Sequence, residues 1–270
     1  MGYSRVQGVG GYQYSLKTGM VGRDPSGHDL ANDANGSCYW IDSQAMDPLW
    51  DFHDSRLAEH ELGFNKDSMN GASYYRIDAP DLSNYNLRTA SGYEEGANDN
   101  FTGIVCDANG NPVKDANNVN IVDPSIYNER TSGGLPEKVS DKVNLDDCSV
   151  SGPVKFKDPN KEAADLRAEA ADIRSQPDGP QKDAAIADWN NRANGLSDRM
   201  SREQSYLDGR IGQHEARMGE YPPGSLEHTR AADNRNWCQE YSDELGRSRD
   251  QLLAAQRGLN NGTDLGNGMC

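Results

Sequence analysis

The sequence predicts an α+β fold: a mixed N-terminal region with short strands and a kinked helix, followed by an all-α, coiled-coil-like antiparallel helical hairpin with one short extra helix. The composition changes near residue 158, from a region rich in Gly, Asn, Asp and Tyr to one rich in Ala, Arg, Glu and Asp. Apolar residues of the second region recur at alternating steps of three and four, which is typical of a coiled-coil seam. The run "EYPPGS" at 220–225 then reverses the chain, because two prolines and a glycine cannot continue a helix.

Two domains are expected, an α+β domain with long polar loops at 1–158 and a helical hairpin domain at 159–270. The connecting run "SGPVKFKDPNK" contains Pro153 and Pro159, which favour a link over a continuous element. The chain has 270 residues, of which 34% are apolar, and a mean hydropathy of -0.90. This length allows two compact domains, but each hydrophobic core must be thin.

Three helices are predicted in the second domain, and a flexible tail is predicted after the last. Their expected bounds are about 160–175, 181–219 and 225–259. The run "QPDGP" at 176–180 separates the first helix from the second, and Ser225 is suited to cap the third.

The two long helices carry the clearest pattern in the sequence. In the second helix, the seam runs from Ile186 to Met200 and loses its strict spacing near Glu203, which predicts a four-residue stutter. In the third helix, the spacing continues from Ala231 to Leu259 without a break. These seams predict an antiparallel pair of helices.

The hairpin is expected to mediate assembly or partner binding. Its seam contains Asn234 and Ser248, and Gly209 and Gly212 lie inside a helix, where each glycine costs about 1 kcal/mol relative to Ala. A hairpin of such low stability is expected to depend on the N-terminal half, on another copy of itself or on a partner. The predicted interface residues are Trp189, Leu196, Met200, Leu207, Ile211, Trp237, Tyr241, Leu245 and Leu252.

Strand-like segments are expected in the first domain, from their alternation or their β-branched and aromatic residues. These segments are 11–19, 72–79, 101–115, 119–123 and 153–157. Between the first two, residues 37–62 predict a helix that is kinked or restarted at Pro48. Long irregular loops are expected at 80–100 and 123–150.

Cys38 is the candidate catalytic residue. Ser37 can cap a helix that begins at Cys38, which would place the thiol at the positive end of the helix dipole and lower its pKa. The segment "NGSCYW" at 35–40 resembles the nucleophile segment of papain-like and ovarian-tumour-type cysteine hydrolases, where Gly, Ser, Cys and an aromatic residue open a helix. The resemblance implies a nucleophilic Cys38. A thiol that packs in the core, or one in a disulfide, is the alternative, since neither His53 nor His60 is placed to serve as its base.

A calcium site is the candidate metal centre. The run "CDANGNPVKDANN" places four oxygen donors at positions 1, 3, 5 and 9 of a calcium-loop template, namely Asp107, Asn109, Asn111 and Asp115. Pro112 stands where the template has glycine, and Asn118 stands where it has the bidentate Glu. A hairpin turn at Asn109 explains the same residues.

Charge and composition limit the partners. The formal charge of -16, from 43 acidic and 27 basic residues, repels phosphate groups, so no nucleic-acid partner is expected. No run of about 18 apolar residues and no classical signal peptide occurs, so we expect no membrane insertion. The expected location is cytoplasmic, virion-associated or reached by a non-classical export route. No cofactor is expected, because the glycine-rich stretches lack a nucleotide-binding pattern.

Taken together, these features favour a structural or interaction protein that binds a protein partner or forms a homo-oligomer. A component of a virion, a secretion apparatus or a surface assembly fits this description. The alternative is an exported cysteine-dependent hydrolase or deamidase that uses Cys38 as its nucleophile.

Overall fold

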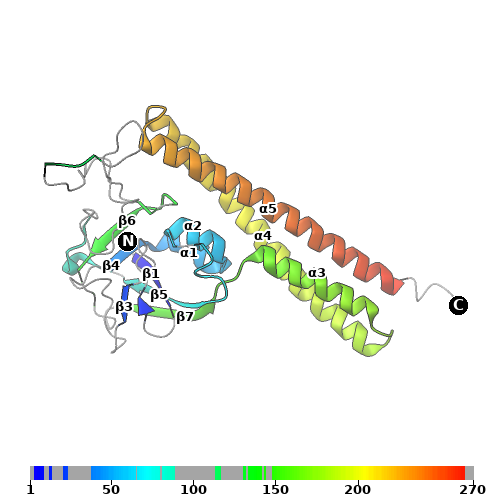
Figure 1. Ribbon diagram of the computed structural model, residues 1–270. Coiled ribbons are helices and arrows are strands. Elements are labelled where there is room, and N and C mark those ends of the chain that lie inside the picture. The colour runs from blue at the N-terminus through cyan, green and yellow to red at the C-terminus, as the bar shows by residue number, and fades with distance from the viewer. Residues whose placement is uncertain are drawn as a thin grey trace. The chain divides into compact units, whose positions relative to one another are not determined.

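The computed structural model divides the chain into two compact units, Met1–Lys157 and Asp158–Cys270 (Figure 1). A β-sheet with two flanking helices forms the first unit, and three helices form the second. The described residues are 3–8, 12–13, 21–23, 38–64, 66–79, 81–88, 113–116, 130–131, 133–141, 143 and 148–264, with side chains described between 40 and 261.

A five-stranded sheet in the order β6-β4-β1-β5-β7 is the framework of the first unit. Each pair of neighbouring strands is antiparallel. The strands are β1, Tyr3–Gly8; β4, Cys38–Asp42; β5, Ser73–Ala79; β6, Glu137–Ser140; and β7, Ser149–Lys155. A separate ribbon pairs β2, Tyr12–Gln13, with β3, Val21–Arg23.

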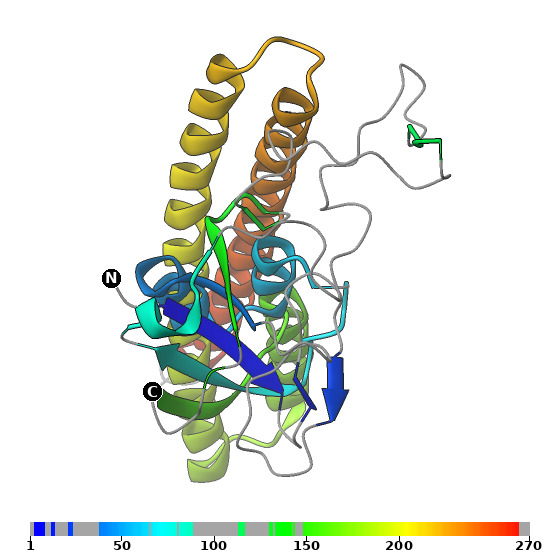
Figure 2. The same ribbon diagram turned by 90° about the vertical axis from the view of Figure 1, so that its left-hand side faces the viewer.

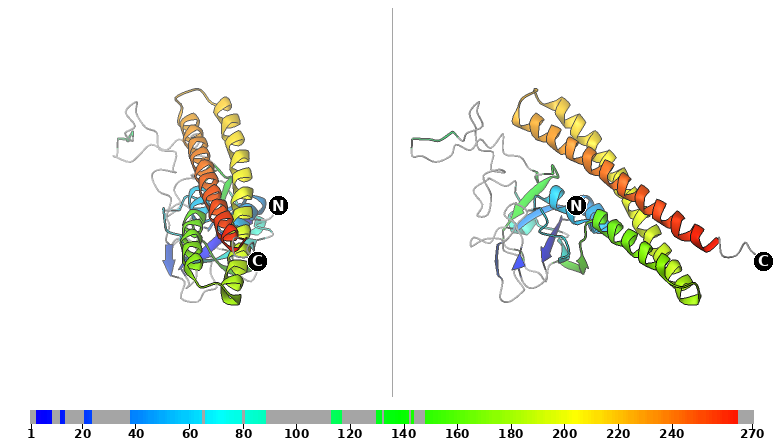
Figure 3. Two further views of the ribbon diagram at one scale, coloured as in Figure 1. Left: turned by 90° about the vertical axis from the view of Figure 1, so that its right-hand side faces the viewer. Right: turned by 45° about the vertical axis from the view of Figure 1, so that its right-hand side comes forward.

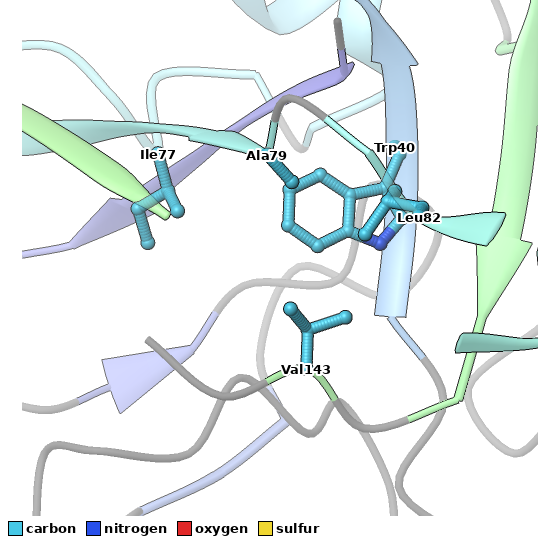
Figure 4. Packing of buried hydrophobic residues seen from close by; sticks show 5 residues of the cluster. All are labelled: Trp40, Ile77, Ala79, Leu82 and Val143. Carbon is cyan, nitrogen blue, oxygen red and sulfur yellow. The ribbon is translucent and has the colours of Figure 1, made fainter. Parts of the chain in front are cut away.

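Trp40 is the centre of the hydrophobic cluster on this sheet. Its indole is fully buried, and Nε1 donates a hydrogen bond to Oγ of Ser140 on the neighbouring strand at 2.8 Å. The Ser140 hydroxyl in turn donates to the backbone oxygen of Asp141. Figure 4 shows the apolar side chains that form the cluster with Trp40, which are Ile77, Ala79, Leu82 and Val143. Residues from distant parts of the sequence therefore share one core.

Two helices follow β4 directly: α1, Ser43–Phe52, and α2, Ser55–Leu62. The carboxylates of Asp42 and Asp54 each accept a backbone N–H bond in the first turn, which caps the two helices. Between them, His53 has a φ of 52°, outside the helical range. The predicted helix at 37–62 is therefore wrong at its start, which is strand, and its interruption falls at His53 rather than at Pro48.

The other strand predictions have mixed outcomes. The segment 72–79 is confirmed as β5, and 153–157 overlaps the end of β7. Of 11–19, the structure describes Tyr12 and Gln13, which form β2, and the rest lies outside the described residues. Most of 101–115 and all of 119–123 lie outside the described residues. Strand β6 was not predicted, since it lies within an expected loop.

Together with the sheet of the first unit, the second unit confirms the predicted fold class, an α+β chain that ends in a helical hairpin with one extra helix. Its helices are α3, Pro159–Ser175; α4, Pro180–Glu220; and α5, Leu226–Asp264. Figure 2 shows α4 and α5 side by side, joined by the short turn that contains Gly224 at a φ of 87°. Ser225 Oγ accepts the N–H of His228, so it caps α5 as predicted. Helix α5 continues beyond residue 259, where the tail was expected to begin.

Helix α3 packs against both long helices (Figure 3). Its buried side is made of Pro159, Ala163, Leu166, Ala170 and Ile173, again at steps of four and three. The indole Nε1 of Trp189 in α4 donates to the backbone oxygen of Leu166 at 2.7 Å. The hydrogen bonds and ion pairs between described side chains of α3 and α4 lie between Lys182 and Arg199, so α3 covers the half of the hairpin away from its turn.

Amide side chains fix the alignment of α4 and α5 beside the seam. Gln256 Nε2 donates to Oδ1 of Asn190 at 3.1 Å and of Asn194 at 2.9 Å. Asn190 Nδ2 donates to Asn260 Oδ1 at 3.0 Å. Because hydrogen bonds are directional, sliding one helix along the other would break all three.

Replacing Ser140 by alanine is expected to destabilise the first unit by about 1–3 kcal/mol, because the substitution leaves the buried indole N–H of Trp40 without its acceptor. The free energy of unfolding from urea titration of the full chain measures this cost. Ser149→Ala, an exposed serine on β7, is the matched control and should stay within about 0.5 kcal/mol of the wild type. Equal effects of the two substitutions would contradict the role given to the Trp40–Ser140 bond.

Candidate functional site

The seam of α4 is continuous, and the predicted stutter near Glu203 is wrong. Its buried residues alternate in steps of three and four through the whole helix. They are Ile186, Trp189, Ala193, Leu196, Met200, Glu203, Leu207, Arg210 and His214. Charged and polar residues therefore occupy core positions in the part of α4 nearest the turn, while the part covered by α3 has an apolar seam.

Glu203 is fully buried, and its carboxylate belongs to a small ionic group. Arg199 Nε lies 3.5 Å from Glu203 Oε1, and Arg199 Nη2 also binds the carboxylate of Glu162 in the first turn of α3. One guanidinium thus serves two carboxylates on two helices. Nearby, Gln204 Nε2 donates to the backbone oxygen of Ser242 in α5 at 3.0 Å.

Most of the predicted interface residues are enclosed by the chain itself. Seven of them are buried, namely Trp189, Leu196, Met200, Leu207, Tyr241, Leu245 and Leu252. Ile211 and Trp237 are half-buried, and the Trp237 ring packs against Tyr241 with centroids 5.0 Å apart and the ring planes tilted by 35°. In this structure, with α3, α4 and α5 packed together, these seven side chains are buried.

The opposite side of α4 presents a row of small, exposed residues that we call the glycine face. It consists of Ser201, Ser205, Gly209, Gly212, Ala216 and Gly219, at steps of four and three. Since an α-helix has 3.6 residues per turn, Gly212 faces away from the buried His214 two positions on. A Cβ built at Gly209, Gly212 or Gly219 would meet no described atom within 4 Å.

Two glycines of α5, Gly246 and Gly258, differ from those of the glycine face, whereas a Cβ built at Gly195 in α4 would likewise meet no described atom within 4 Å. A Cβ at Gly246 would lie 2.9 Å from the Gln204 amide, and one at Gly258 would lie 2.5 Å from the Arg174 guanidinium. Those two glycines make room for side chains of the same unit. Sequence reasoning counted Gly209 and Gly212 only as weaknesses of the helix, although their spacing, continued at Ala216, places them on one side.

Cys38 does not begin a helix. It is the first residue of β4, where its backbone pairs with Ser140, and α1 begins only at Ser43. Cys-Tyr-Trp-Ile is rich in aromatic and β-branched residues, which favour a strand. The argument that a helix dipole lowers the thiol pKa is therefore wrong, and the Cys38 side chain lies outside those that the structure describes.

The two histidines considered beside Cys38 occupy helix ends. His53 terminates α1, and its ring contacts Trp50 and Phe156 with centroid separations of 5.9 and 5.8 Å. His60 lies in the last turn of α2. The position of His53 is accounted for by this ring packing.

The predicted calcium loop lies mostly outside the described residues. This applies to Asp107, Asn109 and Asn111, while Asp115 is described and exposed. Among the side chains that the structure describes, no three His, Cys, Asp or Glu residues are grouped to hold a metal ion.

Glu59 is the best-defined buried acid of the first unit, and its role is structural. Its carboxylate accepts backbone N–H bonds from Asp67 at 2.8 Å and Met69 at 2.7 Å, which ties the loop after α2 to that helix. Burial raises the pKa of Glu59, and this effect outweighs the two N–H bonds, which favour the ionised form. Sequence reasoning missed this residue because no motif marks it.

Comparisons with protein families, curated proteins and solved structures found no match for this chain. None of the described helices is both long and apolar enough to cross a membrane.

The raised pKa of Glu59 predicts a definite pH dependence. A carboxyl group with a raised pKa in the folded state binds its proton more tightly there, so its stabilising contribution is fully present below the ordinary value of 4.5. That contribution is lost as the pH rises through the raised value. We expect the free energy of unfolding of the wild type, minus that of Glu59→Gln, to fall as the pH rises from the ordinary value of 4.5 through the raised pKa.

Urea titrations of the full chain at a series of pH values measure this difference. Asp51→Asn, an acid-to-amide substitution at an exposed position on α1, is the control for the change of residue type outside the buried site. A Glu59→Gln difference that rises with pH would mean that the N–H bonds outweigh burial.

Proposed function

We propose that this chain is an interaction protein whose helical unit takes part in assembly through the glycine face of α4. The observation that carries the proposal is the open space in front of Gly209, Gly212 and Gly219. The backbone does not require glycine at these positions, because none of the three has a positive φ.

The energetic cost of this face supports a role outside the unit. Each exposed glycine in a helix interior costs about 1 kcal/mol relative to alanine. Gly209 and Gly212, which lie well inside α4, forfeit about 2 kcal/mol, a substantial part of the 5–15 kcal/mol by which a domain is usually stable. The described side chains of the unit do not occupy the space gained, whereas they do so at Gly246 and Gly258.

The shape of the face suits a helical partner. Residues without long side chains let another backbone approach closely, and the spacing of four and three keeps them on one side of α4 for about five turns. The flanking residues Arg202, Asp208 and Glu215 are exposed and carry both signs of charge, which suits the polar rim of a protein interface. The cysteine-hydrolase alternative gains no support, since the helix that would activate Cys38 begins at Ser43.

The substitution of alanine for Gly209, Gly212 and Gly219 together is expected to stabilise the second unit by about 2–3 kcal/mol, because alanine has the higher helix propensity and meets no obstacle. Thermal unfolding followed by circular dichroism measures the change. Gly195→Ala, elsewhere on the exposed surface of α4 and equally free of neighbours, should contribute about 1 kcal/mol. Loss of stability in the triple variant would show that the chain itself uses this space.

Docking at the glycine face is tested by introducing a large side chain on that face. A photo-crosslinking amino acid at Ala216 should give a discrete protein adduct, either in the native host or with purified full chain alone. Gly212→Leu should abolish this adduct, while Gly195→Leu should leave it unchanged. Velocity sedimentation then shows whether the adduct is a second copy of the chain. An Ala216 adduct that survives Gly212→Leu, or no adduct above that of a probe at position 195, would overturn the proposal.

A further inference from the structure

Helix α3 depends on a few contacts for its position. Of its five buried residues, Ala163 and Ala170 contribute little apolar area, so Leu166 and Ile173 provide most of it. Polar bonds secure the rest. To α4, Arg199 binds Glu162 near the start of α3 and Arg192 binds Glu169. To α5, Arg167 donates to Gln251, and Arg174 donates to the backbone oxygen of Ala255 at 3.2 Å.

The connection from α3 to α4 allows α3 to move as a rigid piece. Only four residues, 176–179, separate the two helices. Pro177 and Pro180 cannot donate backbone hydrogen bonds, and Gly179 has a φ of 153°. The helical pattern of backbone hydrogen bonds is therefore interrupted at this connection. Lys182 in α4 spans it by donating from its side chain to the carboxylate of Asp178 and to the backbone oxygen of Arg174.

Many contacts between α4 and α5 do not involve α3. The two long helices contact each other along the seam, and the amide bonds of Gln256 to Asn190 and Asn194 lie between them alone. Arg199 and Glu203 are both in α4, so this ion pair can persist when Glu162 departs.

We propose that α3 is a strap that opens as a unit while α4 and α5 remain paired, with the Glu162–Arg199 contact as its fastening. Opening breaks the Trp189–Leu166 hydrogen bond and uncovers the apolar seam around Trp189 and Leu196. Closing restores the Glu162–Arg199–Glu203 group. This strap is independent of the glycine face, which lies on the exposed side of α4, so either proposal can fail without the other.

Hydrogen–deuterium exchange of the full chain under native conditions tests the strap. Amides of α3 are expected to exchange together and at least about tenfold faster than the buried amides of α4 and α5. Glu162→Gln should accelerate exchange of α3 by a further several-fold and leave α4 beyond residue 203 unchanged. Glu169→Gln is the matched control on the same helix, because its partner Arg192 is more exposed than Arg199 and solvent screens the pair, so a smaller change is expected.

A second variant is needed in case the loss of one ion pair changes the exchange rate of α3 by too little to measure. Ile173→Ala removes apolar contact from α3 only and should accelerate its exchange without affecting the turn end of the hairpin. Exchange of α3 at the same rate as α4 and α5 would overturn the proposal. Acceleration of all three helices together in Glu162→Gln or Ile173→Ala would do so as well, since it would mean that the unit opens only as a whole.

Discussion

The seam between α4 and α5 is the constraint on which the second unit depends. Buried residues at alternating steps of three and four keep one side of each helix against the other for the length of the pair. That alternation decides which side of α4 faces outward, and hence where Gly209 and Gly212 lie. It also decides where α3 finds an apolar surface to cover.

Along this seam the chemistry changes from one half to the other. Near α3 the core consists of residues such as Trp189, Leu196 and Met200, whereas nearer the turn it includes Glu203, Arg210 and His214. Burying charged groups carries a desolvation cost that their pairing only partly offsets, so such positions add little stability. Arg199, which also pairs with Glu203 in its own helix, restricts the alignment of α3 on α4, because it reaches Glu162 in one arrangement of these two helices.

The helices could be predicted from the sequence because their signal is local: seam spacing, the Pro-Pro-Gly turn and the capping Ser225 all lie within a few residues of the features they determine. Glu203 and Arg210 were misjudged because charged residues are normally assigned to the surface, and the pattern was taken to break where they occur. Strand β4 was missed for another reason. Cys38 pairs with Ser140, about a hundred residues away, and local sequence holds no record of that partner. The glycine face could be predicted only in part. The spacing of its residues is visible in the sequence, but the open space beside them is not.

The strand order of the first unit has a consequence for how the chain folds. Strand β1, the first to be synthesised, lies at the centre of the sheet, and its neighbours β4 and β5 follow tens of residues later. The edge strands β6 and β7 come last. Such pairings must close long loops before the strands can make stabilising contacts, so the sheet is expected to assemble slowly. The α4–α5 hairpin can instead form its contacts one after another, starting next to its turn. Until β4 and β5 arrive, β1 exposes both of its hydrogen-bonding edges, so the nascent first unit is the part of this protein most exposed to mispairing with other chains.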